Sequence, residues 1–192
     1  MYESGSDPYS YPDSTVLRNR LDIRDQAQLD AYETLITAQR AQEPIPTGRF
    51  GYAHYRAIHR HLFQDVFAWA GKPRTVRISK GGNMFCYPEH IDAAMRRLFE
   101  RLQADNCLRH RSTRDFAKGA AHLLAELNAI HCFREGNGRA QLTFFALLAT
   151  RAGHPAALDR MQPDAMLQAM TDSFTGNEEP LASLIGRMIG IQ

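Results

Sequence analysis

The stretch "HCFREGNGRAQ" (residues 131–141) combines a histidine, an acid, two arginines and a Gly-Asn-Gly turn. Apolar residues recur at helical spacing on both sides, before it at Phe116, Ala120, Leu123, Leu124, Leu127 and Ile130, and after it at Leu142, Phe145, Ala149 and Ala152. These flanks predict two helices joined by a loop. A turn requires glycine or asparagine, but it does not require a base and an acid beside them, so this loop is a candidate site.

Gly136, Asn137 and Gly138 open the second predicted helix. Glycine lets successive backbone N–H groups point into one concavity and leaves no side chain to obstruct an anion. The helix N-terminus adds its own N–H groups and the positive end of the helix dipole. Arg139, in the first turn, is unfavourable for the dipole but well placed for a phosphate. The pattern therefore predicts a phosphate site.

His131 and Glu135 flank this predicted phosphate site. A histidine is the usual general base near neutral pH, so we expect His131 to be catalytic. A carboxylate beside phosphates is repulsive unless a cation lies between them, and Mg²⁺ favours one or two carboxylates plus phosphate oxygens. We therefore expect Glu135 to be a Mg²⁺ ligand. Together these groups indicate transfer from a nucleoside triphosphate to a hydroxyl.

The rest of the chain predicts an all-α fold with one short hairpin. Helical spacing and caps predict further helices at about 25–42 and 51–70, from Pro88 onward, and near 163–173 and 179–190. Val76 and Ile78 alternate with polar residues before a Gly-Gly-Asn turn, which predicts a β-hairpin. A lone hairpin is marginally stable, so it must pack on the helices.

Residues 1–22 are rich in Tyr, Ser, Pro and Asp and predict an extended arm that is pinned by Tyr9, Tyr11, Val16 and Leu17. The whole chain has 192 residues and a formal net charge of +2. That length suits one domain with a short extension, and that charge leaves no strong footprint for nucleic acid.

The compartment is indicated only by what the chain lacks. The sequence has no apolar run of membrane-spanning length and no basic-then-apolar signal pattern, so we expect no membrane association. Its three cysteines, Cys86, Cys107 and Cys132, do not form a disulfide framework. A reducing cytoplasm is the simplest interpretation, although a protein delivered into a host cell by a secretion system would look the same.

The loop resembles the core motif of Fic proteins, written H-P-F-x-D/E-G-N-G-R-x-x-R. Three other stretches are similar to Fic proteins: "YPDSTVLRN" (11–19), "IHRHLFQDVFAWAGKPRTVRISKGG" (58–82) and "FCYPEHI" (85–91). The resemblance implies a helical Fic (Fido) domain over 23–192 after an arm at 1–22. It also implies a hairpin flap at about 74–87 over the active site, and an active-site loop at 131–139, called the motif loop below.

Most Fic enzymes transfer AMP from ATP to a hydroxyl of a target protein, so the resemblance implies an adenylyltransferase acting on Ser, Thr or Tyr. His131 would deprotonate the hydroxyl, Phe133 would anchor the motif loop, and Glu135 would hold Mg²⁺. The implied nucleotide-binding residues are Arg134, Glu135, Gly136, Asn137, Gly138, Arg139, Lys80 and Gly81. The flap would dock the target by backbone pairing through Ile78, Ser79, Gly82, Asn83, Met84 and Phe85.

Two positions depart from the Fic motif. Cys132 replaces the usual proline, which we expect to be a mild change because that proline mainly stiffens the loop. Leu142 replaces the second arginine, which is associated with the outer phosphate of ATP and with an inhibitory glutamate.

Many Fic proteins are held inactive by a helix carrying S/T-x-x-x-E-G/N. The nearest match here runs from Thr175 to Glu179 and is followed by Pro180; its Gly and Pro content makes it a poor helix interior. We therefore expect a separate small antitoxin to restrain this chain.

Several other interpretations are open at this level. The chain could be a nucleotide-binding module with weak or no catalysis, because Leu142 replaces an arginine. The transferred group could come from another nucleotide or a phospho-alcohol, since the loop recognises phosphates and not the base. Cys132 could be a nucleophile with His131 as its base. His122 and Glu126, four residues apart, could be a metal pair, although a surface contact is the simpler expectation.

Overall fold

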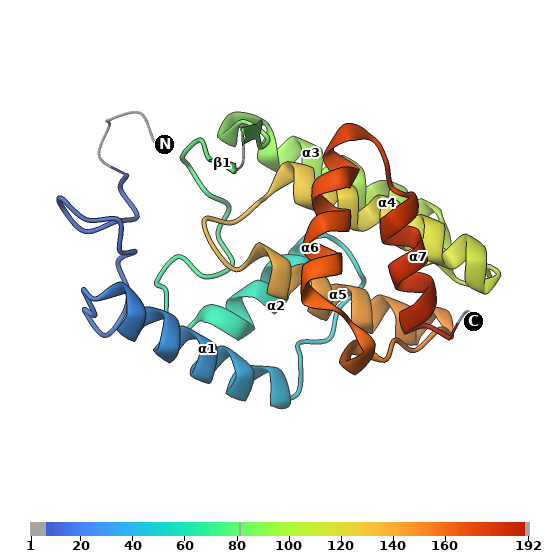
Figure 1. The fold of residues 1–192 in the computed structure, drawn as a ribbon, viewed down its shortest axis with the longest axis horizontal. Coiled ribbons are helices and arrows are strands. Elements are labelled where there is room, and N and C mark those ends of the chain that lie inside the picture. Colours follow the sequence, from blue (N-terminus) through green and yellow to red (C-terminus); the bar gives the residue numbers. More distant parts are fainter. Residues whose placement is uncertain (1–6, 81, 191–192) are drawn as a thin grey trace.

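The structure is a computed structural model that describes residues 7–80 and 82–190, and its fold is helical (Figure 1). The helices and strands, in chain order, are α1 (Gln26–Gln42), α2 (Tyr52–Phe63), β1 (Ser79–Lys80), β2 (Asn83–Met84), α3 (Pro88–Ala104), α4 (Thr113–Ile130), α5 (Asn137–Ala152), α6 (Pro163–Asp172) and α7 (Glu179–Met188). Short 3-10 turns follow α3, α5 and α6. Within the described ranges, no helix is both long enough and apolar enough to cross a bilayer. The predicted all-α class is confirmed.

Two side-chain caps and one proline set the starts of three helices. The carboxylate of Asp25 accepts a hydrogen bond from the Gln28 N–H at the start of α1. Ser112 caps α4 by accepting from the Asp115 N–H, 3.1 Å away. Pro88 occupies the first turn of α3, where its missing N–H costs nothing.

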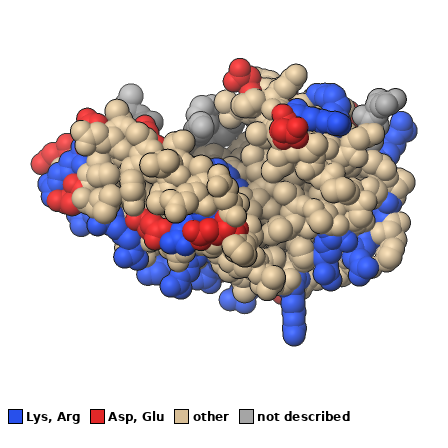
Figure 2. Space-filling model, turned by 90° about the horizontal axis from the view of Figure 1, so that it is seen from below, with Lys and Arg blue, Asp and Glu red and all other residues tan. Residues whose placement is uncertain are grey.

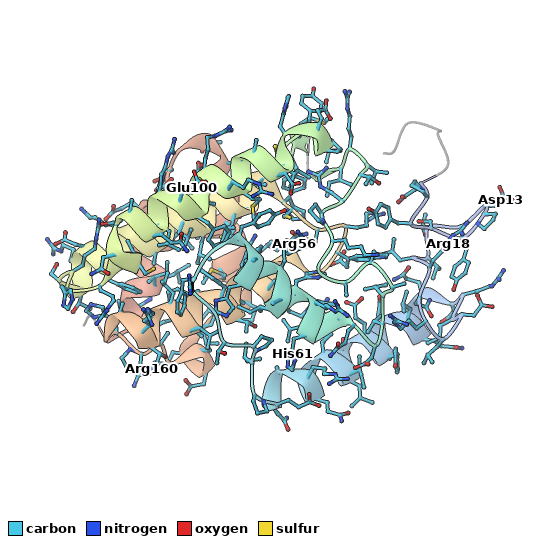
Figure 3. All side chains as sticks on the ribbon, turned by 180° about the vertical axis from the view of Figure 1, so that it is seen from behind. Asp13, Arg18, Arg56, His61, Glu100 and Arg160 are labelled. Carbon is cyan, nitrogen blue, oxygen red and sulfur yellow. The ribbon has the colours of Figure 1, made fainter. Side chains whose placement is uncertain are left out.

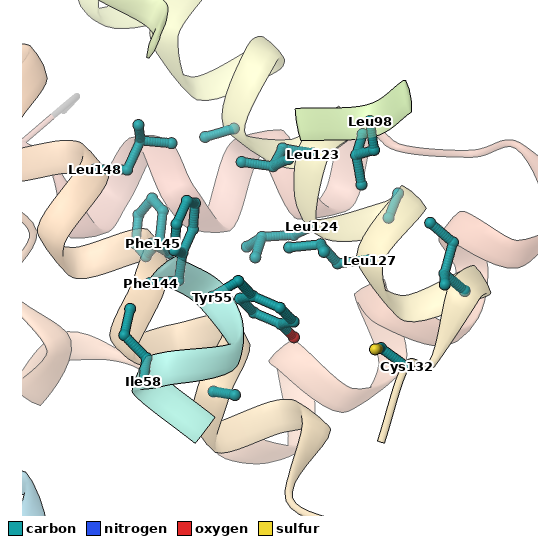
Figure 4. Packing of buried hydrophobic residues seen from close by; sticks show 14 of the residues in the cluster. Tyr55, Ile58, Leu98, Leu123, Leu124, Leu127, Cys132, Phe144, Phe145 and Leu148 are labelled. Atoms are coloured by element: carbon teal, nitrogen blue, oxygen red, sulfur yellow. The ribbon is translucent and has the colours of Figure 1, made fainter. Parts of the chain in front are cut away.

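An aromatic cluster at the centre of the molecule joins α2, α3 and α5. The ring of Tyr55 lies 5.7 Å from that of Phe144, and Phe99 lies 5.3 Å from Phe144, measured between centroids. Figure 4 shows Tyr55 surrounded by Phe144 and the leucines of α4. Phe133, from the motif loop, stacks on Tyr55 at 5.4 Å. The loop is therefore anchored to the core by one ring.

The predicted helix over 51–70 is wrong at its end, because α2 stops at Phe63. Residues 64–72 form successive turns, with hydrogen bonds from Val66 N to Phe63 O and from Lys72 N to Trp69 O. Phe67 and Trp69 stack at 4.4 Å. Residues two apart cannot face each other on a helix, so this stacking requires the turn. Val66 stays buried, which explains why its spacing looked helical.

The hairpin pairs β1 and β2 antiparallel, with Ser79 opposite Met84 and Lys80 opposite Asn83. Its base continues into the body of the molecule, because the Phe85 N–H donates to Ile78 O at 3.3 Å. The Cys86 N–H donates to Ala129 O of α4 at 3.1 Å. The short hairpin thus packs on the helices, as its marginal stability requires.

The described part of the N-terminal segment, from residue 7 to α1, lies against the turns after α2. Ser10 and Leu17 form an isolated antiparallel bridge, and Leu17 is buried. Tyr9 meets Trp69 edge-on at 5.6 Å, and its hydroxyl lies 3.3 Å from that of Thr75. Figure 3 shows this segment, marked by Arg18, beside the helical body.

Candidate active site

The motif loop connects the end of α4 to the start of α5. His131 is the C-cap of α4, with a left-handed φ of 49°, and its N–H donates to Leu127 O. Gly136 is the N-cap of α5 and is also left-handed, with a φ of 79°. Two left-handed residues therefore turn the chain back sharply between the helices, which brings the predicted base and the predicted phosphate site into one short loop.

Asn137 fixes the shape of this loop from inside. Its side chain is buried and makes two reciprocal bonds with Phe133, donating to the Phe133 carbonyl at 2.8 Å and accepting from its N–H at 2.9 Å. Both ends of the amide are therefore occupied by the loop itself. The side chain of Asn137 therefore shapes the loop, and its backbone N–H belongs to the first turn of α5.

His59 of α2 supports the loop from below. Its ring lies between Phe133, at 3.7 Å, and Phe63, at 4.6 Å. The Gly71 N–H donates to Nδ1, so Nε2 carries the proton and donates to the carbonyl of Glu135 at 2.9 Å. Burial lowers the pKa of His59 to about 4, which keeps the ring neutral. Sequence reasoning missed this residue, although it lies four positions after Tyr55 on the same helix face.

The two glycines of the motif serve different purposes. A Cβ on Gly136 would lie 2.3 Å from the Phe63 ring, and the φ of this residue is positive, so the fold itself requires glycine. Gly138 is exposed and has no positive φ, and a Cβ added to it would meet nothing within 4 Å. A glycine inside a helix costs roughly 0.5–1 kcal/mol relative to alanine. The fold therefore gives no reason for Gly138, whereas a ligand that approaches the backbone closely would.

Glu135 lies exposed at the rim of the loop, where one carboxylate oxygen accepts the Gly136 N–H at 2.8 Å. Across residues 7–80 and 82–190, no group of three or more His, Cys, Asp or Glu side chains could hold a metal ion. Mg²⁺ needs only one or two protein carboxylates when substrate phosphates and water complete its shell. One exposed carboxylate beside a helix N-terminus fits that requirement.

The Arg139 side chain already contacts other residues of this protein, which its position in the sequence did not indicate. Its guanidinium forms an ion pair with Glu33 of α1, donates to the Thr37 hydroxyl at 3.1 Å and lies 4.6 Å above the Phe63 ring. Arg139 does not by itself imply a bound anion, as its place in the first turn had suggested, because Glu33 supplies one. The two residues are 106 positions apart, so no local pattern could have paired them.

Glu33 carries an electrostatic cost at this position. Burial raises its pKa above the ordinary value, and the nearby Glu135 carboxylate raises it further, against the opposing effect of Arg139. The Glu33 and Glu135 carboxylates therefore repel each other near the start of α5, while Arg139 attracts Glu33. A cation bound there would relieve the repulsion between Glu33 and Glu135.

A cleft of about 600 Å³ opens beside this cluster, between α1 and α5. Its lining includes Glu33, Thr37, Arg139, Leu142 and Leu158. Leu142, at the position of the second motif arginine, is half-buried on the cleft wall. Figure 2 shows this side of the molecule, with acidic and basic residues together beside a hollow in the surface.

Of three other predicted nucleotide-binding residues, the structure describes the side chain of one, Arg134. Arg134 forms an ion pair with Asp7 at 2.7 Å, and both side chains are little exposed, so it ties the N-terminal segment to the motif loop. Gly81 and the side chain of Lys80 lie outside what the structure describes.

The side chains of the hairpin divide into two sets. Ile78 and Phe85 are buried, whereas Ser79, Gly82 and Met84 are exposed. The Phe85 ring stacks on the imidazole of His131, 3.9 Å away and 19° from parallel. Phe85 can therefore offer a target only its backbone, because its side chain lies against the candidate base.

Two alternative sites fail on geometry. Burial raises the pKa of the Cys132 thiol to about 12, and its sulfur lies 3.5 Å from the Tyr52 hydroxyl, so it is not a thiolate nucleophile. His122 contacts Glu178, 3.0 Å away on the surface, and not Glu126, which removes the suggested metal pair.

Known proteins resemble this chain over nearly its whole length. It is 50% identical over 189 residues, 98% of each chain, to the "Probable protein adenylyltransferase y4lH" of Sinorhizobium fredii. It is 36% identical to the protein adenylyltransferase VbhT of Bartonella schoenbuchensis, of which it spans 40%. The Fic domain of a Bep effector from Bartonella quintana, solved with bound ADP, superposes with a TM-score of 0.86 at 30% identity, covering 94% of this chain and 93% of that one.

The family assignment rests on the central helices. Residues 49–149 match the Fic/DOC family, a range that runs from just before α2 into the last turn of α5 and includes the hairpin and the motif loop. The chain belongs to the Fic/DOC family.

Proposed function

We propose that this chain is a protein adenylyltransferase, which transfers AMP from ATP to a Ser, Thr or Tyr hydroxyl of a target protein. One observation carries the proposal: the start of α5 presents an open backbone at Gly138 in the same loop that holds His131. Relatives at 50% and 36% identity are named as protein adenylyltransferases, and related Fic structures hold ADP or AMPPNP.

The phosphates of ATP would bind at the start of α5. The backbone N–H groups of Asn137 and Gly138 and the positive helix end supply the anion site, the Gly136 N–H joins them when the Glu135 carboxylate releases it, and Arg139 adds a charge-assisted donor. Because Arg139 is paired with Glu33, the phosphate must share this guanidinium with Glu33 or displace it. Glu135 would hold Mg²⁺, which would neutralise the phosphates when bound.

The proposed reaction is an in-line displacement at the α-phosphorus. The acceptor oxygen forms a bond to that phosphorus while the bond to the bridging oxygen of pyrophosphate breaks. His131 takes the acceptor proton, and pyrophosphate leaves with the electron pair. The backbone of His131 is the C-cap of α4, and its ring stacks on Phe85. The imidazole therefore has a fixed orientation.

The target segment would pair with the hairpin. Backbone pairing at a strand tolerates many sequences, and the exposed Met84 side chain would add selectivity. Phe85, with its ring against His131, would link the paired segment to the base.

We also infer that restraint of this enzyme comes from a separate antitoxin. Thr175 closes a 3-10 turn and Glu179 begins α7, so the nearest match to the inhibitory pattern does not lie on one helix. A secreted effector would need the same external restraint before delivery.

The central experiment uses ATP labelled at either the α- or the γ-phosphate. The purified chain is incubated with a cell extract and Mg²⁺, and labelled protein is identified by mass spectrometry. AMP transfer predicts labelled protein that requires the added chain when α-ATP is used, and no label beyond that of the extract alone when γ-ATP is used. Label from neither nucleotide, together with measurable ATP binding, would support a binding module, and label from α-UTP or α-GTP would change the donor.

Glu135→Ala tests the metal assignment. We expect ATP affinity to become insensitive to Mg²⁺ and transfer to fall strongly, because the sole protein carboxylate proposed for the ion is lost. Titration calorimetry with and without Mg²⁺ measures this, with Glu178→Ala as the matched surface control. Mg²⁺-dependent ATP binding that survives in Glu135→Ala would contradict the assignment.

A further inference from the structure

Arg74 is among the most buried charged residues of the described chain, with 2% of its surface exposed. It follows the turns after α2 and precedes the hairpin. Its Nε donates to the carbonyl of His131 at 2.8 Å, and Nη2 donates to that of Ile130 at 3.3 Å. Two of its donors therefore close the C-terminal end of α4, where a cation is favoured by the helix dipole.

The same guanidinium also holds both limbs of the hairpin. Nη1 donates to the Val76 carbonyl at 2.6 Å, and Nη2 donates to the Cys86 carbonyl at 2.6 Å. Val76 precedes β1 and Cys86 follows β2. One planar fork thus joins three pieces of backbone, which a lysine ammonium, a compact group on a flexible stem, cannot reproduce at the same positions.

Other contacts join the same pieces. The Arg74 N–H donates to the Cys132 carbonyl at 2.9 Å, and the Cys86 N–H donates to Ala129 of α4 at 3.1 Å. The Phe85 ring stacks on His131 at 3.9 Å. The base of the hairpin and the backbone of His131 are consequently parts of one hydrogen-bonded unit.

We propose that Arg74 is a positioning residue for the transfer reaction, which sets the hairpin that receives the target at a fixed separation from His131. The roles of the hairpin and of His131 rest on the proposed function, whereas the coupling itself rests on the contacts above. A reacting group misplaced by about 1 Å can cost on the order of a hundredfold in rate. A residue that controls this separation therefore acts on catalysis without touching either substrate.

Arg74→Lys is the test, and Arg56→Lys is its matched control. Arg56 also donates from Nε to a carbonyl, that of Gly71 at 2.8 Å, and Figure 3 labels it on α2. We expect Arg74→Lys to lower kcat on the order of a hundredfold and to raise the KM for the labelled acceptor. Mg·ATP affinity should stay within about threefold of the wild type, because the start of α5 is untouched. Arg56→Lys should leave all three quantities near the wild-type values.

Hydrogen exchange gives a readout that needs no activity. In Arg74→Lys the amides of Phe85, Cys86 and His131 should exchange at least about tenfold faster, while that of Tyr55, bonded to Gly51, should keep its rate. If the wild type transfers no AMP, the proposed function fails, but this exchange pattern still decides the coupling. Should the pattern appear while kcat and acceptor KM stay at wild-type values in an active enzyme, Arg74 is only structural and the positioning role is overturned.

A second variant covers the case in which Arg74→Lys does not fold. Phe85→Leu keeps an apolar side chain in the buried position but removes the ring from His131. We expect about a tenfold loss of kcat with unchanged Mg·ATP affinity. Wild-type kcat in Phe85→Leu, with Arg74→Lys unfolded or merely less stable, would overturn the proposal.

Discussion

The two ends of the motif loop are built in opposite ways. At the first end, His131 lies against the buried Phe85 ring, and its carbonyl is held by the buried Arg74. At the second end, Glu135 and Gly138 are exposed, and the Arg139 side chain retains 40% of its accessible surface. The first end is buried and tied to its neighbours, as the proposed proton transfer would require, and the second end is open, as the proposed binding of a charged ligand would require.

The difference separates residues whose identity the fold explains from residues whose identity only the proposed ligand would explain. Asn137 and Gly136 belong to the motif, yet the contacts of Asn137 and the crowding at Gly136 are explained by the fold alone. Gly138 has no such explanation. We therefore expect substitutions within this one short motif to have different effects: some should lower stability, and others should weaken ligand binding.

His131→Ala should have the largest effect. Removal of a general base lowers the rate by about 10² to 10⁴, while Mg·ATP affinity should stay nearly intact because the base acts on the acceptor. Transfer of α-label and titration calorimetry measure the two quantities, with His122→Ala on the surface of α4 as the control. Full transfer by His131→Ala would remove the proposed mechanism.

His59 predicts a pH dependence of stability. Its pKa is about 4 in the folded state against an ordinary 6.5, so the unfolded chain takes up the proton first as pH falls. The contribution of the neutral, buried ring to the free energy of unfolding is complete above about pH 6.5 and is lost as pH approaches 4. The total is on the order of 3 kcal/mol. The free energy of unfolding, measured with urea between pH 7 and 4, should therefore fall less steeply with decreasing pH for His59→Gln than for the wild type. Equal slopes would mean that His59 is not buried neutral.

Gly136→Ala and Gly138→Ala make the same substitution at two positions two residues apart, at the start of α5. Gly136→Ala should lower the free energy of unfolding by at least about 2 kcal/mol, through strain at positive φ and contact with Phe63. Gly138→Ala should leave stability unchanged or raise it by up to about 1 kcal/mol, but weaken Mg·ATP binding about tenfold. Thermal melting and calorimetry compare the two. Wild-type ATP affinity in Gly138→Ala would show that ligand does not approach this backbone.

Leu142→Arg should have the smallest effect. The new guanidinium would line the same cleft as Glu33 and Arg139, so Glu33 would be shared and Arg139 would be more available to phosphate. A charge-assisted contact of about 1.4 kcal/mol would tighten Mg·ATP binding about tenfold. Leu142→Gln is the uncharged control. A lower melting temperature for Leu142→Arg with no gain in affinity would instead make Leu142 a core residue.

Local patterns in the sequence predicted most of the fold. The starts of the helices near residue 25 and at Pro88, and the Gly-Gly-Asn turn signal, depend on neighbours within a few residues, so they are visible in the sequence alone. The end of α2 was not predictable, because Val66 and Trp69 keep helical spacing while the chain already turns. Hydrophobic periodicity reports burial, and burial does not distinguish a helix from compact turns.

The sequence by itself determined which residues could carry chemistry, since His131, Glu135 and the two glycines stand together within eight positions. Only the tertiary structure decided their surroundings: Glu33 reaches Arg139 from α1, His59 holds the carbonyl of Glu135, and Arg74 ties His131 to the hairpin. The physical reason is range. Caps and turns depend on neighbours along the chain, whereas these ion pairs and carbonyl contacts join groups separated by 57 to 106 residues, whose meeting follows from the packing of the helices.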